Sequence, residues 1–413
     1  MLIRTIAKHD RIAAEALRCE RKALTKLAFG RPHVPAPLRA IGLALLPALF
    51  ASCSTVRPEP VNSALASQVG QLFLVGFRGT TVGGNAELEH LVCRLKVGGV
   101  ILFQVDWTVG PRAARNIASP AQVTALTEGL QRLAQSCGNS PLLIAADNEG
   151  GQVQRLHPSL GYTPAMSHAE LGSQDDLSLT ELESGRIART LREAGINWNL
   201  APVVDLALNP ENSVIVQRGR SFGADPDRVT AHARAYLLGH RAEKILTSLK
   251  HYPGHGSSRD DSHKGFVDIS ETARLDLELA PYRQLIREGL VDSVMTAHVF
   301  NHHLDPHHPA TLSPVTITKL LREELGFEGV VVSDDLHMGA IVQHYGIEEA
   351  ALLALQAGVD LVLLSNNGAV YDSEVADRVH AAILNAISEG RLDAARIEAS
   401  YDRIQKLKAK LRR

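Results

Sequence analysis

Residues 245–263 read Ile-Leu-Thr-Ser-Leu-Lys-His-Tyr-Pro-Gly-His-Gly-Ser-Ser-Arg-Asp-Asp-Ser-His. The apolar run 245–249 has strand character and leads directly into a segment rich in Lys, His and Asp. Pro253, Gly254 and Gly256 exclude a regular helix in that segment. The charged groups therefore leave the end of a predicted buried strand and enter a loop. A strand that fixes positions and a loop that exposes side chains together form a common setting for catalysis.

The same alternation of strand and helix continues on both sides of this segment, from about residue 64 onward. Near-continuous apolar runs are typical of parallel strands that are buried on both faces. Such runs, interleaved with helices, predict the α/β class and a single (β/α)8 barrel of the TIM type. A doubly wound open sheet is the alternative, but no glycine-rich dinucleotide motif follows the first run. The predicted strands are 72–77, 99–103, 142–147, 197–202, 247–251, 293–298, 329–334 and 360–365, and helices are predicted at 121–137, 177–194, 347–357, 375–389 and 390–413.

Composition excludes several classes of protein. The chain has 413 residues, of which 45% are hydrophobic and 21% charged, as in ordinary globular proteins. Its formal net charge of -2 and aromatic content of 4% argue against a nucleic-acid partner. The four cysteines are widely spaced and form no Cys-x-x-Cys pair, so the sequence predicts neither a zinc site nor a disulfide framework.

The N-terminal region differs in character from the rest of the chain. A basic stretch precedes the apolar run 40–51, which is short for a membrane span but suits the apolar core of a signal peptide. Small residues and then Cys53 resemble the lipobox of bacterial lipoproteins, in which that cysteine is lipidated. The alternative is a short helix in a cytoplasmic extension. We therefore predict an export segment with a long basic start at 1–53, a polar tether at 54–63 and the barrel at 64–413.

Ionisable side chains follow the predicted strands at their C-terminal ends, and no comparable set lies at the N-terminal ends. The active site of a (β/α)8 barrel lies at the carboxyl ends of its strands. This asymmetry favours an enzyme over a binding scaffold. The side chains are Asp147 and Arg155 after the third strand, Asp205 and Arg220 after the fourth, Lys250, His251, His255, Asp261 and His263 after the fifth, His298 after the sixth, and Asp334 and Asp335 after the seventh.

Two carboxylate sites in this set suit different chemical roles. Asp334 and Asp335 end an apolar strand, where a rigid carboxylate could serve as a nucleophile or stabilise a cationic transition state. Either one could instead cap the following helix. Asp261 lies two residues from His263 and could accept its N–H, which suits the imidazole to proton transfer near neutral pH. The alternative for this pair is a solvated polar loop.

Other members of the set are candidates for ligand binding. Asp147, Arg155 and Arg220 could bind sugar hydroxyls, an N-acetyl group or a carboxylate, and each arginine could also be an ordinary surface charge. The spacing of His251 and His255 also permits a metal site with His263 or Asp261. Pro253 and Gly254 prevent the two histidines from sharing a helix face, so we predict no metal and no cofactor. A second histidine-rich loop carries His302, His303, His307 and His308.

Eight short motifs occur in order over about residues 65–405. They are Gly-Gly-Val-Ile-Leu-Phe at 98–103, Asp-Asn-Glu-Gly-Gly-Gln-Val-Gln-Arg at 147–155, Asn-Leu-Ala-Pro-Val-Val-Asp at 199–205, Arg-Ser-Phe-Gly at 220–223, the 250–263 loop, Met-Thr-Ala-His at 295–298, Pro-Ala-Thr-Leu-Ser at 309–313 and Ser-Asp-Asp-Leu at 333–336. Together these motifs resemble glycoside hydrolase family 3, in its bacterial β-N-acetylglucosaminidase (β-hexosaminidase) branch.

This resemblance implies a role for each matching residue. Asp334 would be the nucleophile of a retaining reaction, His263 the general acid/base and Asp261 its supporting carboxylate. The sugar-binding residues would be Asp147, Arg155, Arg220, Lys250 and His251. The implied substrate is a terminal, non-reducing β-linked N-acetylglucosamine, typically from peptidoglycan fragments, cleaved through a glycosyl-aspartate intermediate. We expect Gly254 and Gly256 to let the loop swing His263 over the glycosidic oxygen.

Two other functions remain open from the sequence. A histidine acid/base would repel phosphate less than a carboxylate would, so the protein could be a phosphorylase. It could also be a non-catalytic sugar-binding lipoprotein of the cell envelope. The export signal predicts an envelope location, whereas many relatives in Gram-negative bacteria are cytoplasmic. Residues 104–112 look like an insertion after the second strand that could reshape an outer subsite.

Overall fold

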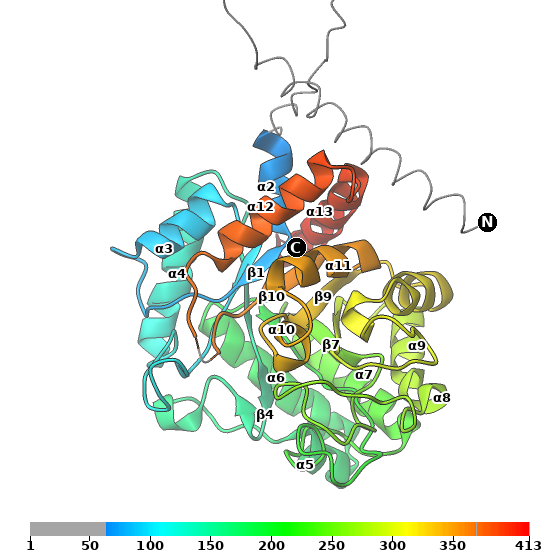
Figure 1. Cartoon of the computed structure of the whole chain (residues 1–413). Helices are drawn as coiled ribbons and strands as arrows, with labels where there is room; N and C mark the ends of the chain where they lie inside the picture. Colours follow the sequence, from blue (N-terminus) through cyan, green and yellow to red (C-terminus); the bar gives the residue numbers. More distant parts are fainter. Residues whose placement is uncertain (1–62, 369, 413) are drawn as a thin grey trace, which may run out of the picture. The chain divides into compact units, whose positions relative to one another are not determined.

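A closed barrel of parallel strands forms the centre of the computed structural model, which describes residues 63–368 and 370–412. The strands follow the order β1-β10-β9-β8-β7-β6-β3-β2 around the barrel (Figure 1). This confirms the predicted (β/α)8 barrel, and each predicted run overlaps one barrel strand. The strands are β1 (Phe73–Val75), β2 (Gly99–Ile101), β3 (Leu143–Ala146), β6 (Trp198–Asn199), β7 (Leu246–Tyr252), β8 (Ser293–Thr296), β9 (Val330–Asp335) and β10 (Leu361–Leu364). The predicted export segment at 1–53 and all of the predicted tether except Ser63 lie outside the described residues, and Ser63 is the first residue of helix α2 (Ser63–Gln71).

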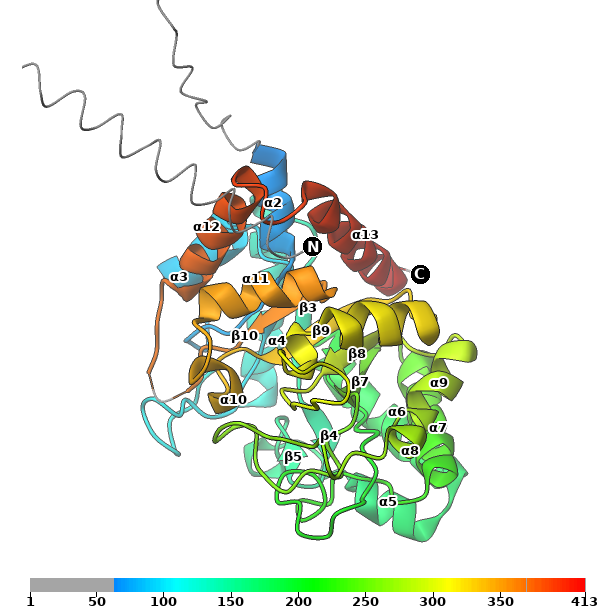
Figure 2. The same cartoon turned by 45° about the vertical axis from the view of Figure 1, so that its right-hand side comes forward.

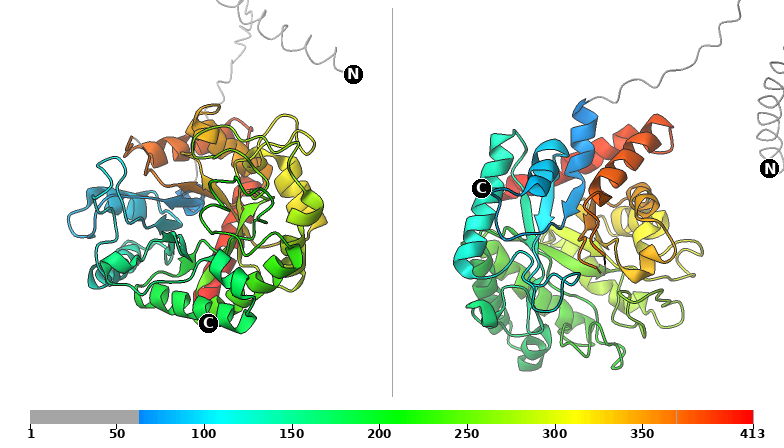
Figure 3. Two further views of the ribbon diagram at one scale, coloured as in Figure 1. Left: turned by 90° about the horizontal axis from the view of Figure 1, so that it is seen from below. Right: turned by 60° about the vertical axis from the view of Figure 1, so that its left-hand side comes forward.

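Helices form a ring around the strands when the barrel is viewed from below (Figure 3, left). The longer ones are α2 (Ser63–Gln71), α4 (Pro120–Ser136), α6 (Leu177–Glu193), α7 (Pro226–Ala242), η4 (Val315–Glu324), α11 (Ile347–Ala357), α12 (Val375–Ser388) and α13 (Ala394–Ala409). Shorter ones are α3 (Ala86–Glu89), η1 (His90–Arg94), η2 (Pro158–Leu160), α5 (His168–Gln174), α8 (Leu275–Glu278), α9 (Ala280–Arg287), η3 (Ala310–Leu312), α10 (Gly339–Val342) and η5 (Lys410–Arg412). A small antiparallel hairpin, β4 (Asn148–Gly150) and β5 (Val153–Gln154), follows β3.

Local sequence signals explain where the long helices begin. The Ser119 and Asp225 side chains accept backbone N–H groups at the starts of α4 and α7, and a proline follows each cap. Such caps satisfy amide groups that the first helical turn leaves free, and proline is well suited to the first helical position. Capping residues therefore set the register in which each helix meets the barrel.

Pairing between β1 and β10 closes the barrel, with Phe73 opposite Val362 and Leu74 opposite Leu363. Helix α2 packs against α12 and α13 beside this closure (Figures 1 and 2). The first and last helices of the described chain thus stabilise the same part of the barrel.

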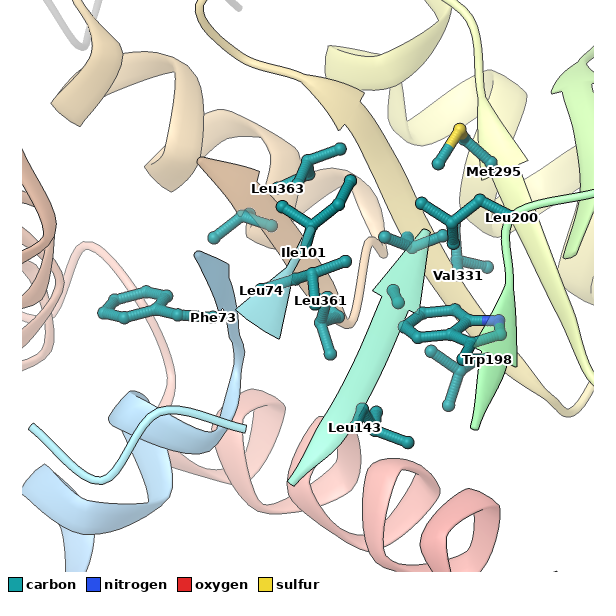
Figure 4. Close-up of a cluster of buried hydrophobic side chains, with 14 of the residues drawn as sticks. Phe73, Leu74, Ile101, Leu143, Trp198, Leu200, Met295, Val331, Leu361 and Leu363 are labelled. Atoms are coloured by element: carbon teal, nitrogen blue, oxygen red, sulfur yellow. The ribbon is translucent and has the colours of Figure 1, made fainter. Parts of the chain in front are cut away.

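Apolar side chains pack inside the barrel and between its strands and the surrounding helices, and Figure 4 labels ten residues of this core. Leu143, Trp198 and Val331 come from β3, β6 and β9 and are fully buried. Burying one large apolar side chain contributes about 1.5–3 kcal/mol. A rigid core of this kind fixes the strand ends that carry the polar groups.

Two strands lose regular register where they reach the polar end of the barrel. In β7, Lys250 and His251 fall between the pairs Leu249–Val294 and Tyr252–Thr296. The register between β9 and β10 shifts in the same way before Asp335. Such irregularities change the direction of side chains and are common beside active sites.

One prediction about cysteines is wrong. Cys93 and Cys137 form a disulfide between η1 and the end of α4, with 5.4 Å between their Cα atoms. The two residues are 44 positions apart, so no local motif marks the pair, and the packing of η1 against α4 brings them together. Across residues 63–368 and 370–412, no helix combines the length and apolarity needed to cross a membrane.

Candidate active site

A pocket of about 320 Å³ opens where the barrel strands reach their carboxyl ends. Ile101, Met295 and Leu363 belong to the barrel core and also line this pocket (Figure 4). Its polar lining consists of Gln104, Asp147, Arg155, His263, Asp334, Asp335, Ser365 and Asn367, and Phe103, Val105, Trp107 and Met338 complete it. Charged groups from several strands therefore meet in one space.

The two adjacent aspartates of β9 have different partners. Asp335 Oδ1 accepts the backbone N–H groups of Ser365 at 3.0 Å and His337 at 3.2 Å, and Asp335 Oδ2 accepts the Ser365 hydroxyl. Burial raises the pKa of Asp335, but bonds from His337 and Ser365 outweigh it and hold the pKa below its ordinary value. Asp334 Oδ1 accepts the N–H of Asp335 at 2.8 Å. Asp335 thus holds β9 to the segment after β10, while Asp334 presents a carboxylate to the pocket.

His263 reaches the pocket from the loop after β7, and 62% of its side chain is exposed. Its Nδ1 lies 2.9 Å from Asp261 Oδ1, and the same oxygen accepts the His263 backbone N–H. Partial burial raises the pKa of Asp261, but the two bonds from His263 outweigh this effect and hold the pKa below its ordinary value. The carboxylate therefore stays ionised at neutral pH. An ionised partner at Nδ1 orients the ring and leaves Nε2 for proton transfer.

The loop that carries His263 is fastened to its surroundings. The N–H groups of Gly339 and Ala340, in α10, donate to the carbonyl groups of His263 and Ser262. A Cβ atom on Gly256 would lie 1.8 Å from the Leu206 carbonyl oxygen, and one on Gly254 would lie 2.7 Å from Glu278 Oε1. Close packing therefore explains both glycines, and our expectation that they serve as hinges does not fit their contacts.

His255 stabilises the same loop from within. Its ring nitrogens lie 2.8 Å from Ser258 Oγ and 3.0 Å from Ser262 Oγ. Burial lowers the pKa of His255 to about 4, so the ring is neutral at neutral pH. A buried, neutral imidazole that bridges two hydroxyl groups is a structural contact.

A chain of opposite charges runs from the pocket into the protein. Lys250 Nζ lies 2.8 Å from Asp147 Oδ1 and 2.7 Å from Glu149 Oε1. Arg220 binds both oxygens of Glu149 at 2.8 Å and lies 3.3 Å from His251 Nε2. The chain ends where His251 Nδ1 meets Asp205 at 2.6 Å and begins where Arg155 meets Asp147 at 3.5 Å.

Alternation of charge keeps the carboxylates of this chain ionised. Burial raises the pKa of Glu149, but Arg220 and Lys250 lower it well below the ordinary value. The pKa of Asp147 is lowered for the same reason, with Lys250 and Arg155 as the cationic partners. Buried charges are stable only when paired and hydrogen-bonded, so the chain is expected to be rigid.

The predicted site residues fall into two layers. Asp147, Arg155, His263 and Asp334 line the pocket, and Asp261 binds His263 behind the rim. The other three predicted sugar-binding residues, Lys250, His251 and Arg220, are at most 9% exposed and are not among the lining residues. They support Asp147 through the charge chain.

The residues of the 250–263 loop do not form a cluster of potential metal ligands. Within the described residues, the one cluster whose potential ligand atoms lie close together is Glu271, His302 and His303. All three are exposed and lie outside the pocket lining. His251 and His255 instead bind Asp205 and two serines.

Sequence reasoning assigned no role to Glu149, although it lies in the 147–155 motif. The available signal was the position of Glu149, an acidic residue two positions from Asp147 and close to several predicted strand ends with cationic side chains. Trp107 also lines the pocket and was noted only as part of the 104–112 insertion.

The fold and the pocket together define a (β/α)8-barrel enzyme with carboxylates and an imidazole at its active end. The chain belongs to glycosyl hydrolase family 3, because residues 64–407 match the family's N-terminal domain.

Individual relatives agree with this assignment. The chain is 35% identical to beta-hexosaminidase A of Pseudoalteromonas piscicida, over 79% of this chain and 55% of that protein. It is 33% identical to beta-hexosaminidase LpqI of Mycobacterium tuberculosis, over 86% of each chain. The structure of a family 3 beta-N-acetylglucosaminidase from Paenibacillus sp. matches with a TM-score of 0.77 at 39% identity, over 84% of this chain and 62% of that one. The chain therefore spans little more than half of some relatives and most of others.

Proposed function

We propose that this glycoside hydrolase is a retaining exo-β-N-acetylhexosaminidase that removes terminal non-reducing N-acetylglucosamine. The observation that carries the proposal is the pocket in which Asp334 and His263 meet Asp147 and Arg155. Two relatives named beta-hexosaminidases and a related beta-N-acetylglucosaminidase structure support the choice of sugar. A pocket of about 320 Å³ lies at the small end of the range for ligand sites, which suits a short saccharide bound by its terminal sugar.

In the first step, an Asp334 oxygen attacks the anomeric carbon as the glycosidic C–O bond breaks. The protonated His263 ring donates its Nε2 proton to the departing oxygen, so the leaving group departs as a neutral alcohol. In the second step, His263 accepts a proton from water, the water oxygen bonds to the anomeric carbon, and Asp334 departs as a carboxylate. Two displacements at one carbon return the product with its original β configuration.

Asp147 and Arg155 are the groups placed to bind the hydroxyl and N-acetyl groups of the bound sugar. Lys250, which also pairs with Glu149, holds Asp147 in a fixed position, and Lys250 and Arg155 together keep Asp147 ionised. A preorganised carboxylate favours one orientation of the sugar ring before the reaction begins. Lys250, Arg220 and His251 thus act through Asp147 in this proposal.

A chromogenic β-N-acetylglucosaminide tests the proposal. Turnover should exceed that of the matching β-glucoside, and Asp334→Ala should abolish it. Sugar binding without turnover would favour the non-catalytic alternative. Product analysis with and without phosphate separates hydrolysis from phosphorolysis, because a phosphorylase would release the sugar 1-phosphate.

We further propose that the protein is exported and acts in the cell envelope on peptidoglycan fragments. The 40–53 segment supports export, and the Cys93–Cys137 disulfide suits an oxidising compartment. Mass spectrometry of the mature protein tests this. We expect a chain that begins at a lipidated Cys53, and a full-length chain in the cytoplasm would contradict the proposal.

A further inference from the structure

The outer rim of the pocket is formed by two segments that are bound to each other. Asn367 Nδ2 donates to the Val105 carbonyl at 3.0 Å, and Asn367 Oδ1 accepts from the Trp107 N–H at 3.3 Å. The Thr108 hydroxyl donates to the Gly368 carbonyl at 3.1 Å, and Arg115 donates to the Asn367 side chain at 3.2 Å. The insertion after β2 and the loop after β10 therefore form one connected rim.

A buried carboxylate fixes the insertion from below. Asp106 is 4% exposed and forms an ion pair with Arg78 at 2.7 Å. The same carboxylate accepts the backbone N–H groups of Thr108 at 3.2 Å and Val109 at 3.3 Å. The backbone on both sides of Trp107 is thereby held in place.

The Trp107 side chain lines the pocket, yet the residue is 60% exposed. Trp198, the other tryptophan of the chain, is fully buried in the barrel. A tryptophan that stays exposed on a fixed backbone offers an apolar ring surface at little cost in conformational entropy. Gln104 also lines the pocket, and a glutamine amide can bind hydroxyl groups.

We infer that Trp107 is the stacking platform of a subsite for the leaving group, and that this group is a sugar ring. The inference rests on the proposed function. His263, which protonates the departing oxygen in the proposed reaction, lines the same pocket as Trp107, so a leaving group beside His263 is within the space that the indole borders. A sugar ring has an apolar C–H face that suits an indole and hydroxyl groups that suit an amide.

Two substrates with the same N-acetylglucosaminyl unit test this subsite. One is the β-1,4-linked disaccharide of N-acetylglucosamine, and the other is β-N-acetylglucosaminyl fluoride, whose leaving group has no ring. In Trp107→Ala, the ratio of kcat/KM for the disaccharide to kcat/KM for the fluoride should fall about tenfold, as expected for one lost apolar contact. Trp107→Phe should restore most of the ratio. Val109→Ala is the control, because Val109 is 69% exposed in the same insertion but is not a lining residue.

The possible results separate the inference from the proposed function. A ratio that stays unchanged in Trp107→Ala, whether both rates fall together or neither falls, would overturn the subsite. If the wild-type protein cleaved neither substrate, the proposed function itself would be wrong. If Val109→Ala reduced the ratio as much as Trp107→Ala did, a general effect of the loop would replace the stacking role.

Discussion

At the scale of single residues, neighbouring side chains of one type have different functions. Asp335 uses its oxygens to join β9 to Ser365 and His337, whereas Asp334 faces the pocket. His298 supports this arrangement, since its Nε2–H donates to the Asp335 carbonyl at 2.9 Å and its Nδ1 lies 2.8 Å from the Thr311 hydroxyl oxygen. Asp334 is therefore held by a neighbour that is itself fixed.

His263→Ala should affect substrates according to their leaving groups. A sugar leaving group needs a proton in the first step, so kcat/KM, which reports that step, should fall about 10²- to 10⁴-fold. A 2,4-dinitrophenyl leaving group departs without a proton. The kcat/KM for a substrate that carries it should therefore fall far less. Steady-state kinetics on both substrates measures the difference, with His307→Ala as a control for an exposed histidine outside the pocket lining. Equal losses on the two substrates would contradict the acid/base role.

The residues proposed to react were evident locally in the sequence, whereas most of their partners were not. Asp334 ends an apolar strand, and Asp261 lies two residues from His263, so both are evident locally. Pairs such as Arg220 with Glu149 are 71 residues apart, and only the closure of the barrel brings them together.

At the scale of elements, the charge chain joins β7 to the segment after β3 through Lys250. Lys250→Met would leave Asp147 and Glu149 as buried carboxylates without this cation. Losing one partner of a buried ion pair costs roughly 3–5 kcal/mol, so the free energy of unfolding should fall by about that amount. Denaturant unfolding measures the loss, with the exposed Lys319→Met as control. If Lys250→Met lowered the free energy of unfolding no more than Lys319→Met did, the charge chain would add little stability.

Glu278, in α8, should make stability depend on pH. Burial raises its pKa to about 7 from an ordinary 4.5, and bonds from Arg274 and Ser257 oppose the shift only partly. Between these values the folded protein binds more protons than the unfolded one, so stability falls as pH rises. From pH 5 to pH 8, wild type should lose about 2 kcal/mol relative to Glu278→Gln.

Chemical unfolding across that pH range tests the role of Glu278. Glu328→Gln provides the control, because Glu328 is exposed. Parallel pH profiles for wild type and Glu278→Gln would contradict the prediction.

The barrel strands were predictable because most of them lie in largely apolar runs of sequence. The β4–β5 hairpin was not predicted, since its strands of three and two residues contain polar residues and glycine. The register shift at Lys250 and His251 depends on the facing strand β8, and residues 245–263 alone carry no signal for it.

At the scale of the whole molecule, the disulfide limits the freedom of the unfolded chain. Reducing Cys93–Cys137, or replacing both cysteines with serine, should lower the free energy of unfolding by roughly 2–4 kcal/mol, given the 44-residue separation. Thermal unfolding with and without reductant measures this effect. The double variant is its own control, because reductant should not change its melting temperature. A reductant effect of the same size in the double variant would contradict the assignment.

The central claim is that Asp334 forms a covalent bond to the sugar. The most direct test is the mass of the intact protein and of its peptides after incubation with a slow, ring-fluorinated β-N-acetylglucosaminyl fluoride. We predict a mass increase of one glycosyl unit on the peptide that contains Asp334, and no increase in Asp334→Asn. An adduct on another residue, or an equal adduct in Asp334→Asn, would contradict the claim.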